Sequence, residues 1–152
     1  MWLALAVAAC DKEPIDPAFA NPRATAMTLL RAHHLDRMPE DEIRRRMSRS
    51  DEGRFGAVDQ PLVARCFEDF DDDDPVDHGL VGFLVGVLAA RRNELEVKTE
   101  GDRAVVSAGP AGRLVMHLGD QGWKISIEES VPRAYRERME GLYERARKKG
   151  GR

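Results

Sequence analysis

The amino-acid sequence predicts an α+β fold: N-terminal helices packed on a curved antiparallel meander of about four strands, with an extra C-terminal helix. Three observations support this prediction. Apolar residues recur at helical spacing as far as Arg92, the apolar period changes to two after Asn93, and a helical pattern returns at Pro132. Helices that precede a run of short strands are typical of this class, because they cover the apolar face of the sheet.

Length and composition indicate one domain. The chain has 152 residues, of which 42% are hydrophobic and 34% are charged. A chain of this length buries about 70% of its unfolded surface, so it needs no metal or disulfide to fold. The 24 basic and 27 acidic residues give a net charge of −3. This balance excludes a globally basic nucleic-acid binder, and we expect no nucleic-acid partner.

Residues 1–9 are uncharged and apolar, but the run is too short to span a bilayer, which needs about 20 residues. The tetrad Val7-Ala8-Ala9-Cys10 resembles the lipobox of bacterial lipoproteins. This resemblance implies that residues 1–9 are a signal-peptide remnant and that Cys10 carries a lipid, with acyl chains such as palmitate. Because nothing basic precedes Trp2, we expect the true start to lie upstream of Met1. The alternative is an ordinary apolar terminus with an incidental cysteine.

A lipidated Cys10 predicts a protein of the bacterial cell envelope, on the periplasmic or extracytoplasmic face, with the membrane as a partner. Asp11 resembles the inner-membrane retention signal of enteric lipoproteins and favours that membrane. Three prolines within residues 10–22 disfavour a helix, so we expect this stretch to be a tether. Residues 23–152 are then the single α+β domain.

Four helices are predicted in the first part of the domain. The first covers residues 23–37 and is stopped by Pro39; the second opens with acidic residues 40–42 and fades near Gly53. The third covers residues 60–70. The fourth, of about twelve residues, ends before Arg91 and is too short for a membrane span, so we expect it in the core. Its apolar residues follow i, i+3, i+4, i+7 and i+8 spacing: Leu80, Phe83, Leu84, Val87 and Leu88.

Four strands follow, over residues 95–99, 103–108, 114–118 and 123–127, with glycine-containing turns between them. Alternation predicts one apolar face made of Leu95, Val97, Thr99, Leu114, Met116, Leu118, Trp123, Ile125 and Ile127. Six of these residues are predicted to line an apolar pocket: Leu95, Val97, Leu114, Met116, Trp123 and Ile125. Pro132 begins the last helix.

The helices, the hairpin at residues 100–106 and the closing strand at residues 122–125 resemble the cystatin-like, cone-shaped superfamily of nuclear transport factor 2 and ketosteroid isomerase. Residues 23–128 are similar to its lipoprotein branch of unknown function. In enzymes of this superfamily an acid or base lies inside the cone. None of the predicted inward residues titrates, which favours a binding role with an apolar ligand or an unknown envelope protein as partner. The alternative is a small isomerase or dehydratase with a helix-borne His34 or Asp36.

An acidic cluster precedes the fourth helix, with seven carboxylates within residues 68–77. Calcium binding through Asp71, Asp73 and Asp77 is one hypothesis, because hard cations prefer oxygen ligands. The cluster is no EF-hand, since a loop starting at Asp69 has Asp74 at its sixth position, where glycine is needed. The competing interpretation is a solvated loop that caps the next helix. A calcium-binding envelope scaffold is therefore a second alternative function.

Further candidates are weaker. Cys66 falls in a helical apolar stripe, which favours a buried thiol over a nucleophile. His117 is predicted to face away from the cone interior. Residues 133–152 carry a net charge of +5; we favour a solvated helix over one that touches anionic lipids.

The sequence has no glycine-rich phosphate loop and no Gly-x-Ser-x-Gly or Cys-x-x-Cys motif, and we expect no cofactor. The predicted function is a lipid-anchored, non-enzymatic binding or interaction module.

Overall fold

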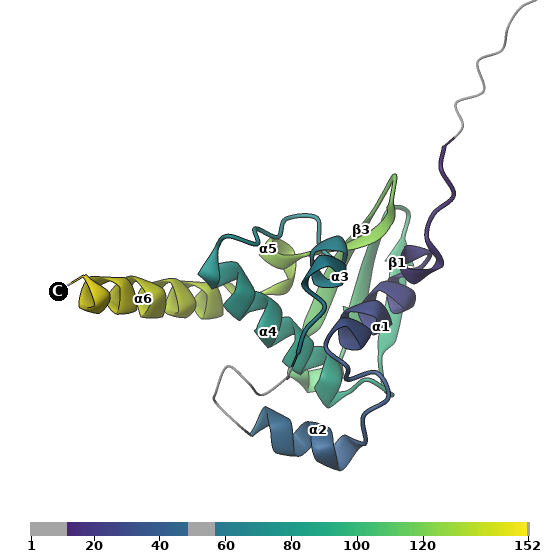
Figure 1. Cartoon of the computed structure of the whole chain (residues 1–152). Helices are drawn as coiled ribbons and strands as arrows, with labels where there is room; N and C mark the ends of the chain where they lie inside the picture. The colour runs from purple at the N-terminus through teal and green to yellow at the C-terminus, as the bar shows by residue number, and fades with distance from the viewer. Residues whose placement is uncertain (1–11, 49–56, 152) are drawn as a thin grey trace, which may run out of the picture.

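The α+β class is confirmed by the computed structural model, which describes residues 12–48 and 57–151 (Figure 1). Most helices precede a four-stranded antiparallel sheet, and a long helix ends the described chain. Several predicted features lie outside the described residues: the signal remnant 1–9, Cys10, Asp11 and the end of the second helix near Gly53.

The helical elements are short, apart from two. They are η1 (Pro17–Phe19), α1 (Pro22–Ala32), α2 (Glu40–Met47), α3 (Gln60–Arg65), α4 (Pro75–Ala90), η2 (Gly109–Ala111), α5 (Ile127–Ser130) and α6 (Arg133–Gly150). Three helices begin with a side-chain cap: Asn21 caps α1, Asp59 caps α3 and Asp74 caps α4, each by accepting a backbone N–H of the first turn. In each case a proline follows the cap within two positions. This pairing of a capping residue with a proline in the first turn is why these helices begin where they do.

The first predicted helix is shorter than expected, because α1 ends at Ala32 and not at residue 37. His34 adopts a left-handed conformation with φ 58°, and the N–H of Leu35 donates to Leu30 O at 2.9 Å. This 6→1 bond is the Schellman arrangement, and it turns the buried Leu35 back into the core. His34 and Asp36 therefore lie in a loop, which corrects the prediction of a helix-borne acid or base.

The four strands form a meander in the order β1 (Glu96–Glu100), β2 (Arg103–Ser107), β3 (Arg113–Gly119) and β4 (Gly122–Ser126). The register places Val97 opposite Val106 and Val106 opposite Leu114, so Val97 and Leu114 share one face as predicted. Ile127 begins α5, which corrects its assignment to the fourth strand. The outer edge of β4 is covered by the chain at residues 66–68: Ile125 N donates to Cys66 O at 2.8 Å and Glu68 N donates to Ile125 O at 3.0 Å.

The helices and the sheet enclose one hydrophobic core. Leu29 of α1 and Leu84 of α4 belong to the same buried cluster as the sheet residues Leu114, Met116 and Ile125. Of the six residues predicted to line a pocket, Val97 packs against this cluster, and the others are buried members of it: Leu95, Leu114, Met116, Trp123 and Ile125. Helix side chains therefore pack where the sequence predicts a ligand pocket.

Candidate functional site

The segment ahead of α1 is fixed to the domain. Asp16 caps η1 by accepting the N–H of Ala18 at 2.9 Å, and Arg65 of α3 donates to its other oxygen at 2.7 Å. The Ala18 N–H and the Arg65 side chain hold the pKa of Asp16 below its ordinary value. Phe19 is 1% exposed and belongs to the core. The chain is thus attached to the helices and the sheet from Asp16 onward, ahead of the start of α1.

Strand β4 contacts the same N-terminal segment from the sheet. Gly122 has φ 101°, and a Cβ on it would lie 2.8 Å from the Cβ of Phe19, so only glycine lets η1 approach β4 this closely. Lys124 donates to Arg65 O, and its ammonium lies 4.5 Å from the centre of the Phe19 ring. Burial lowers the pKa of Lys124. Helix α3 and strand β4 together hold the start of the domain in place.

The acidic cluster works mainly as a set of backbone caps. Asp74 accepts the N–H of Val76 at 2.8 Å at the start of α4, and the buried Asp77 accepts the N–H of Asp71 at 2.9 Å. Asp71 in turn accepts the N–H of Asp73 at 3.0 Å. Within the described parts of the chain, no three His, Cys, Asp or Glu side chains are grouped so that they could hold a metal ion. The structure therefore does not assemble Asp71, Asp73 and Asp77 into a calcium site.

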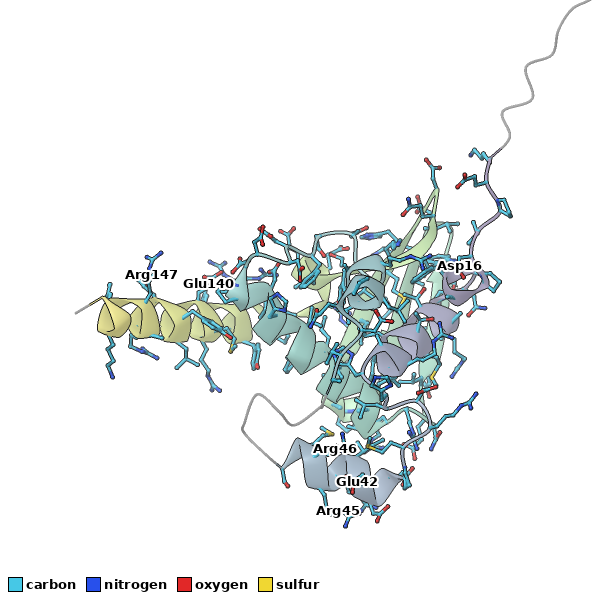
Figure 2. The ribbon with its side chains drawn as sticks, in the orientation of Figure 1. Asp16, Glu42, Arg45, Arg46, Glu140 and Arg147 are labelled. Carbon is cyan, nitrogen blue, oxygen red and sulfur yellow. The ribbon has the colours of Figure 1, made fainter. Side chains whose placement is uncertain are left out.

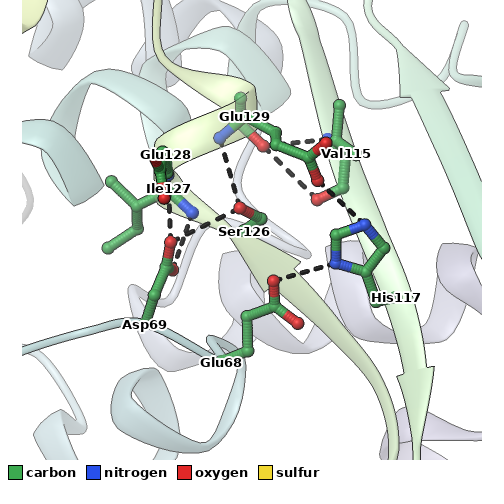
Figure 3. Close-up of polar contacts among 9 residues, drawn as sticks. Glu68, Asp69, Val115, His117, Ser126, Ile127, Glu128 and Glu129 are labelled. Carbon is green, nitrogen blue, oxygen red and sulfur yellow. Dashed lines mark hydrogen bonds and ion pairs between the residues drawn. The ribbon is translucent and has the colours of Figure 1, made fainter.

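Another member of the cluster caps α5 from a distance in the sequence. Asp69 accepts the N–H groups of Ile127 at 2.8 Å and of Glu128 at 3.0 Å, as Figure 3 shows. Ser126 supplies the conventional cap by accepting the N–H of Glu129 at 3.2 Å. Both contacts hold α5 at the end of β4.

His117 lies between two carboxylates on the sheet face opposite the core-facing Met116, which confirms its predicted direction. Its Nδ1 is 2.8 Å from a Glu68 oxygen, and its Nε2 is 2.8 Å from a Glu129 oxygen (Figure 3). An imidazolium ring can donate to both, whereas a neutral ring can donate to only one. This arrangement links β3 to α5 and to the acidic cluster. Sequence reasoning missed it because Glu68 is 49 residues from His117.

The remaining candidate side chains have structural partners. The Sγ of Cys66 is fully buried and donates to Leu62 O at 3.3 Å, and burial raises its pKa to about 12, which confirms the predicted buried thiol. His33 is buried, with Nδ1 2.9 Å from Leu29 O, and burial lowers its pKa. The ring of His78 contacts the backbone oxygen of Asp72 at 2.7 Å.

Helix α6 is attached to the body mainly along its first half. The ring of Tyr135 lies 4.3 Å from that of Phe83, and Met139 packs against Gly79, so α6 runs antiparallel to α4. Its end projects past the start of α4, and residues 142–151 are exposed (Figures 1 and 2). The last turn carries Arg147, Lys148 and Lys149. No residue of α6 is fully buried.

Two general findings complete the description. Across the described ranges, no helix combines the length and apolar character needed to cross a membrane. Comparisons with family models, with curated proteins and with solved structures found no match to this chain. The resemblance to the cone-shaped superfamily and to lipoproteins stays a prediction from the sequence.

Proposed function

We propose that this chain is a lipid-anchored interaction module of the bacterial cell envelope, with Cys10 as the anchor and the second half of α6 as the surface that meets a protein partner. The anchor is inferred from the lipobox-like tetrad that ends at Cys10. The core is filled by helix side chains, so the binding surface is sought on the exterior.

The observation that carries the interaction role is the projecting end of α6. Although the ring of Tyr143 lies near Gly79 of α4, Leu142 and Tyr143 both stay exposed beside a cationic last turn. Exposed apolar side chains flanked by charge are a common feature of helices that bind partners. Part of the positive charge at the end of α6 is already balanced within the helix, since Lys148 pairs with Glu144 at 2.8 Å.

The anchor is tested in cells that express the protein from its own genomic context. We expect it to fractionate with membranes and to show the mass of a lipid on Cys10, and we expect the Cys10→Ala variant to lose both. A soluble wild-type protein that has an unmodified Cys10 would contradict the proposal. The Cys66→Ala variant is the matched control, because its thiol is buried and its loss leaves Cys10 in place.

The interaction role is tested by ending the chain after Tyr143 and replacing the exposed Leu142 by serine. Because the residues removed are exposed, we expect the free energy of unfolding to change by less than about 0.5 kcal/mol. We expect chemical crosslinks to envelope proteins to be lost at the same time. If the truncated protein keeps every crosslink of the full chain, α6 is not the binding surface.

A further inference from the structure

Two of the large apolar side chains on the described surface meet at the point where the chain leaves the domain toward Cys10. Ile15 is 42% exposed and Leu118 is 41% exposed. Although they are far apart in the sequence, both line one open hollow, together with Lys12, Glu13, Gly119 and Asp120. Single exposed apolar residues are ordinary, but two that converge from separate elements form a patch. We call Ile15 and Leu118 the tether-side patch.

The position of this patch relative to Cys10 is restricted. Ile15 is five positions after Cys10, and an extended chain covers about 3.5 Å per residue, so the patch lies within about 18 Å of the anchor. Ile15 cannot swing away from the body, because the next residue, Asp16, pairs with Arg65 at 2.7 Å. Its side chain also lies against Gly122 at the start of β4. A lipid on Cys10 would therefore bring this end of the domain to the bilayer.

We infer that Ile15 and Leu118 rest in the interfacial region of the membrane, so that the β3–β4 turn faces the lipid and α6 points away from it. The inference builds on the proposed lipidation of Cys10. In Figure 1 the described N-terminal residues, 12–16, and α6 leave the body on different sides, as this orientation requires. The contact is shallow, because Asp120 in the turn beside Leu118 must stay hydrated.

The chemistry of the contact is apolar and not electrostatic. The hollow carries one lysine and two carboxylates, so it has no excess of positive charge to attract anionic headgroups. Binding that relies on burying apolar side chains keeps its strength in high salt, whereas a basic helix on anionic lipids loses it. Salt dependence therefore separates contact through the tether-side patch from contact through the cationic end of α6.

The test anchors the full chain chemically. Phosphatidylcholine vesicles that contain a maleimide lipid capture Cys10, while the buried Cys66 thiol, whose pKa is about 12, stays unmodified. In a Trp2→Phe background, Leu118→Trp reports on the patch, with Ile15→Trp as a second reporter. Leu142→Trp, at a position that is 46% exposed on α6, is the matched control. Vesicles with brominated acyl chains quench an indole that contacts lipid, and the background from the buried Trp123 is measured in the Trp2→Phe protein without a reporter.

We expect quenching of the Leu118→Trp and Ile15→Trp variants to exceed that of Leu142→Trp several-fold, and to persist at about 1 M salt, where charges are screened beyond about 3 Å. Equal quenching at all positions, or quenching that disappears in salt, would overturn the inference. It would also fall if both reporters were already shielded from water before coupling and their emission did not change on coupling. Because the anchor is supplied chemically, these outcomes do not depend on lipidation of Cys10 in cells.

Discussion

Cys66 illustrates how burial decides the chemistry of one side chain. Its thiol is fully buried and hydrogen-bonded to Leu62 O, and its pKa is raised to about 12. Since the thiolate is the reactive form, we expect native Cys10→Ala protein to show no thiol reactive toward a disulfide reagent at neutral pH. One thiol should appear on unfolding in urea. Rapid labelling of the folded variant would mean that the site opens locally.

His33 should make stability depend on pH. Burial holds its pKa below the ordinary value of 6.5 in the folded protein. As pH falls through that value, the unfolded chain binds a proton that the folded chain does not, so the free energy of unfolding should fall toward acid. The measurement is the urea midpoint between about pH 7.5 and pH 5.5, a range set by the ordinary histidine pKa.

The matched variants are His33→Asn and His34→Asn. Asparagine can keep a donor near Leu29 O at position 33, and it tolerates the left-handed conformation at position 34. We expect His33→Asn to flatten the pH dependence and the exposed His34→Asn to retain it. An unchanged slope in His33→Asn would show that another group carries the effect.

Asp69 and Asp73 belong to the same acidic cluster but differ in their contacts. Asp69 accepts two backbone N–H groups of α5, whereas the Asp73 carboxylate is exposed. We expect Asp69→Ala to lower the free energy of unfolding by about 1–2 kcal/mol and Asp73→Ala to change it by less than about 0.5 kcal/mol. Urea titrations of the two variants measure this difference. Equal losses would mean that the charge of the cluster, and not the cap, matters.

At the scale of elements, η1 acts as the first part of the core. Phe19→Ala should lower the free energy of unfolding by about 3 kcal/mol, because a buried aromatic ring is replaced by a cavity between α3 and β4. Ile15→Ala, four residues earlier and exposed, should change it by less than about 0.5 kcal/mol. Urea unfolding of both variants compares a buried and an exposed position of the segment ahead of α1. A small loss for Phe19→Ala would show that η1 adds little to the stability of the core.

The elements also show which parts of the fold the sequence can predict. The alternation of apolar and polar residues correctly predicts that Val97, Leu114 and Met116 share one face of the sheet. This prediction needs only the local geometry of a strand, in which successive side chains point to opposite faces. The end of α1 is missed because histidine takes the left-handed position that glycine usually occupies. The role of Phe19 is missed because three prolines around it indicate a tether and hide one buried ring.

The candidate contacts were harder to predict than the elements. The contacts of His117 and Asp69 join segments that are about fifty residues or more apart, and no local pattern encodes such pairs. The acidic cluster is visible in the sequence, but its use as caps depends on which backbone N–H groups it meets. Alternation also predicts Leu118 on the apolar face, but Leu118 is 41% exposed near the end of β3, since alternation does not show how far the helices cover that face.

At the scale of the whole molecule, we expect calcium to leave the free energy of unfolding unchanged, because the acidic cluster already caps backbone N–H groups. Asp71, Asp74 and Asp77 already accept backbone N–H groups, so gathering carboxylates around an ion would break those bonds. We expect calorimetry to give no binding heat, and thermal unfolding to show no change in Tm, at about millimolar calcium, the range of weak extracellular sites. A clear rise in Tm with calcium but not with magnesium would revive the scaffold hypothesis.

The open edge of the sheet matters if many copies share one membrane surface. Residues 66–68 cover the β4 edge, which leaves β1 as the edge strand, with the sequence Glu-Val-Lys-Thr-Glu. Two copies that paired antiparallel about the centre of β1 would set Lys98 against Lys98 and Glu96 against Glu100. Like charges directly opposite each other destabilise such a pair. Crowding in two dimensions would therefore concentrate these domains without fusing their sheets into fibrils.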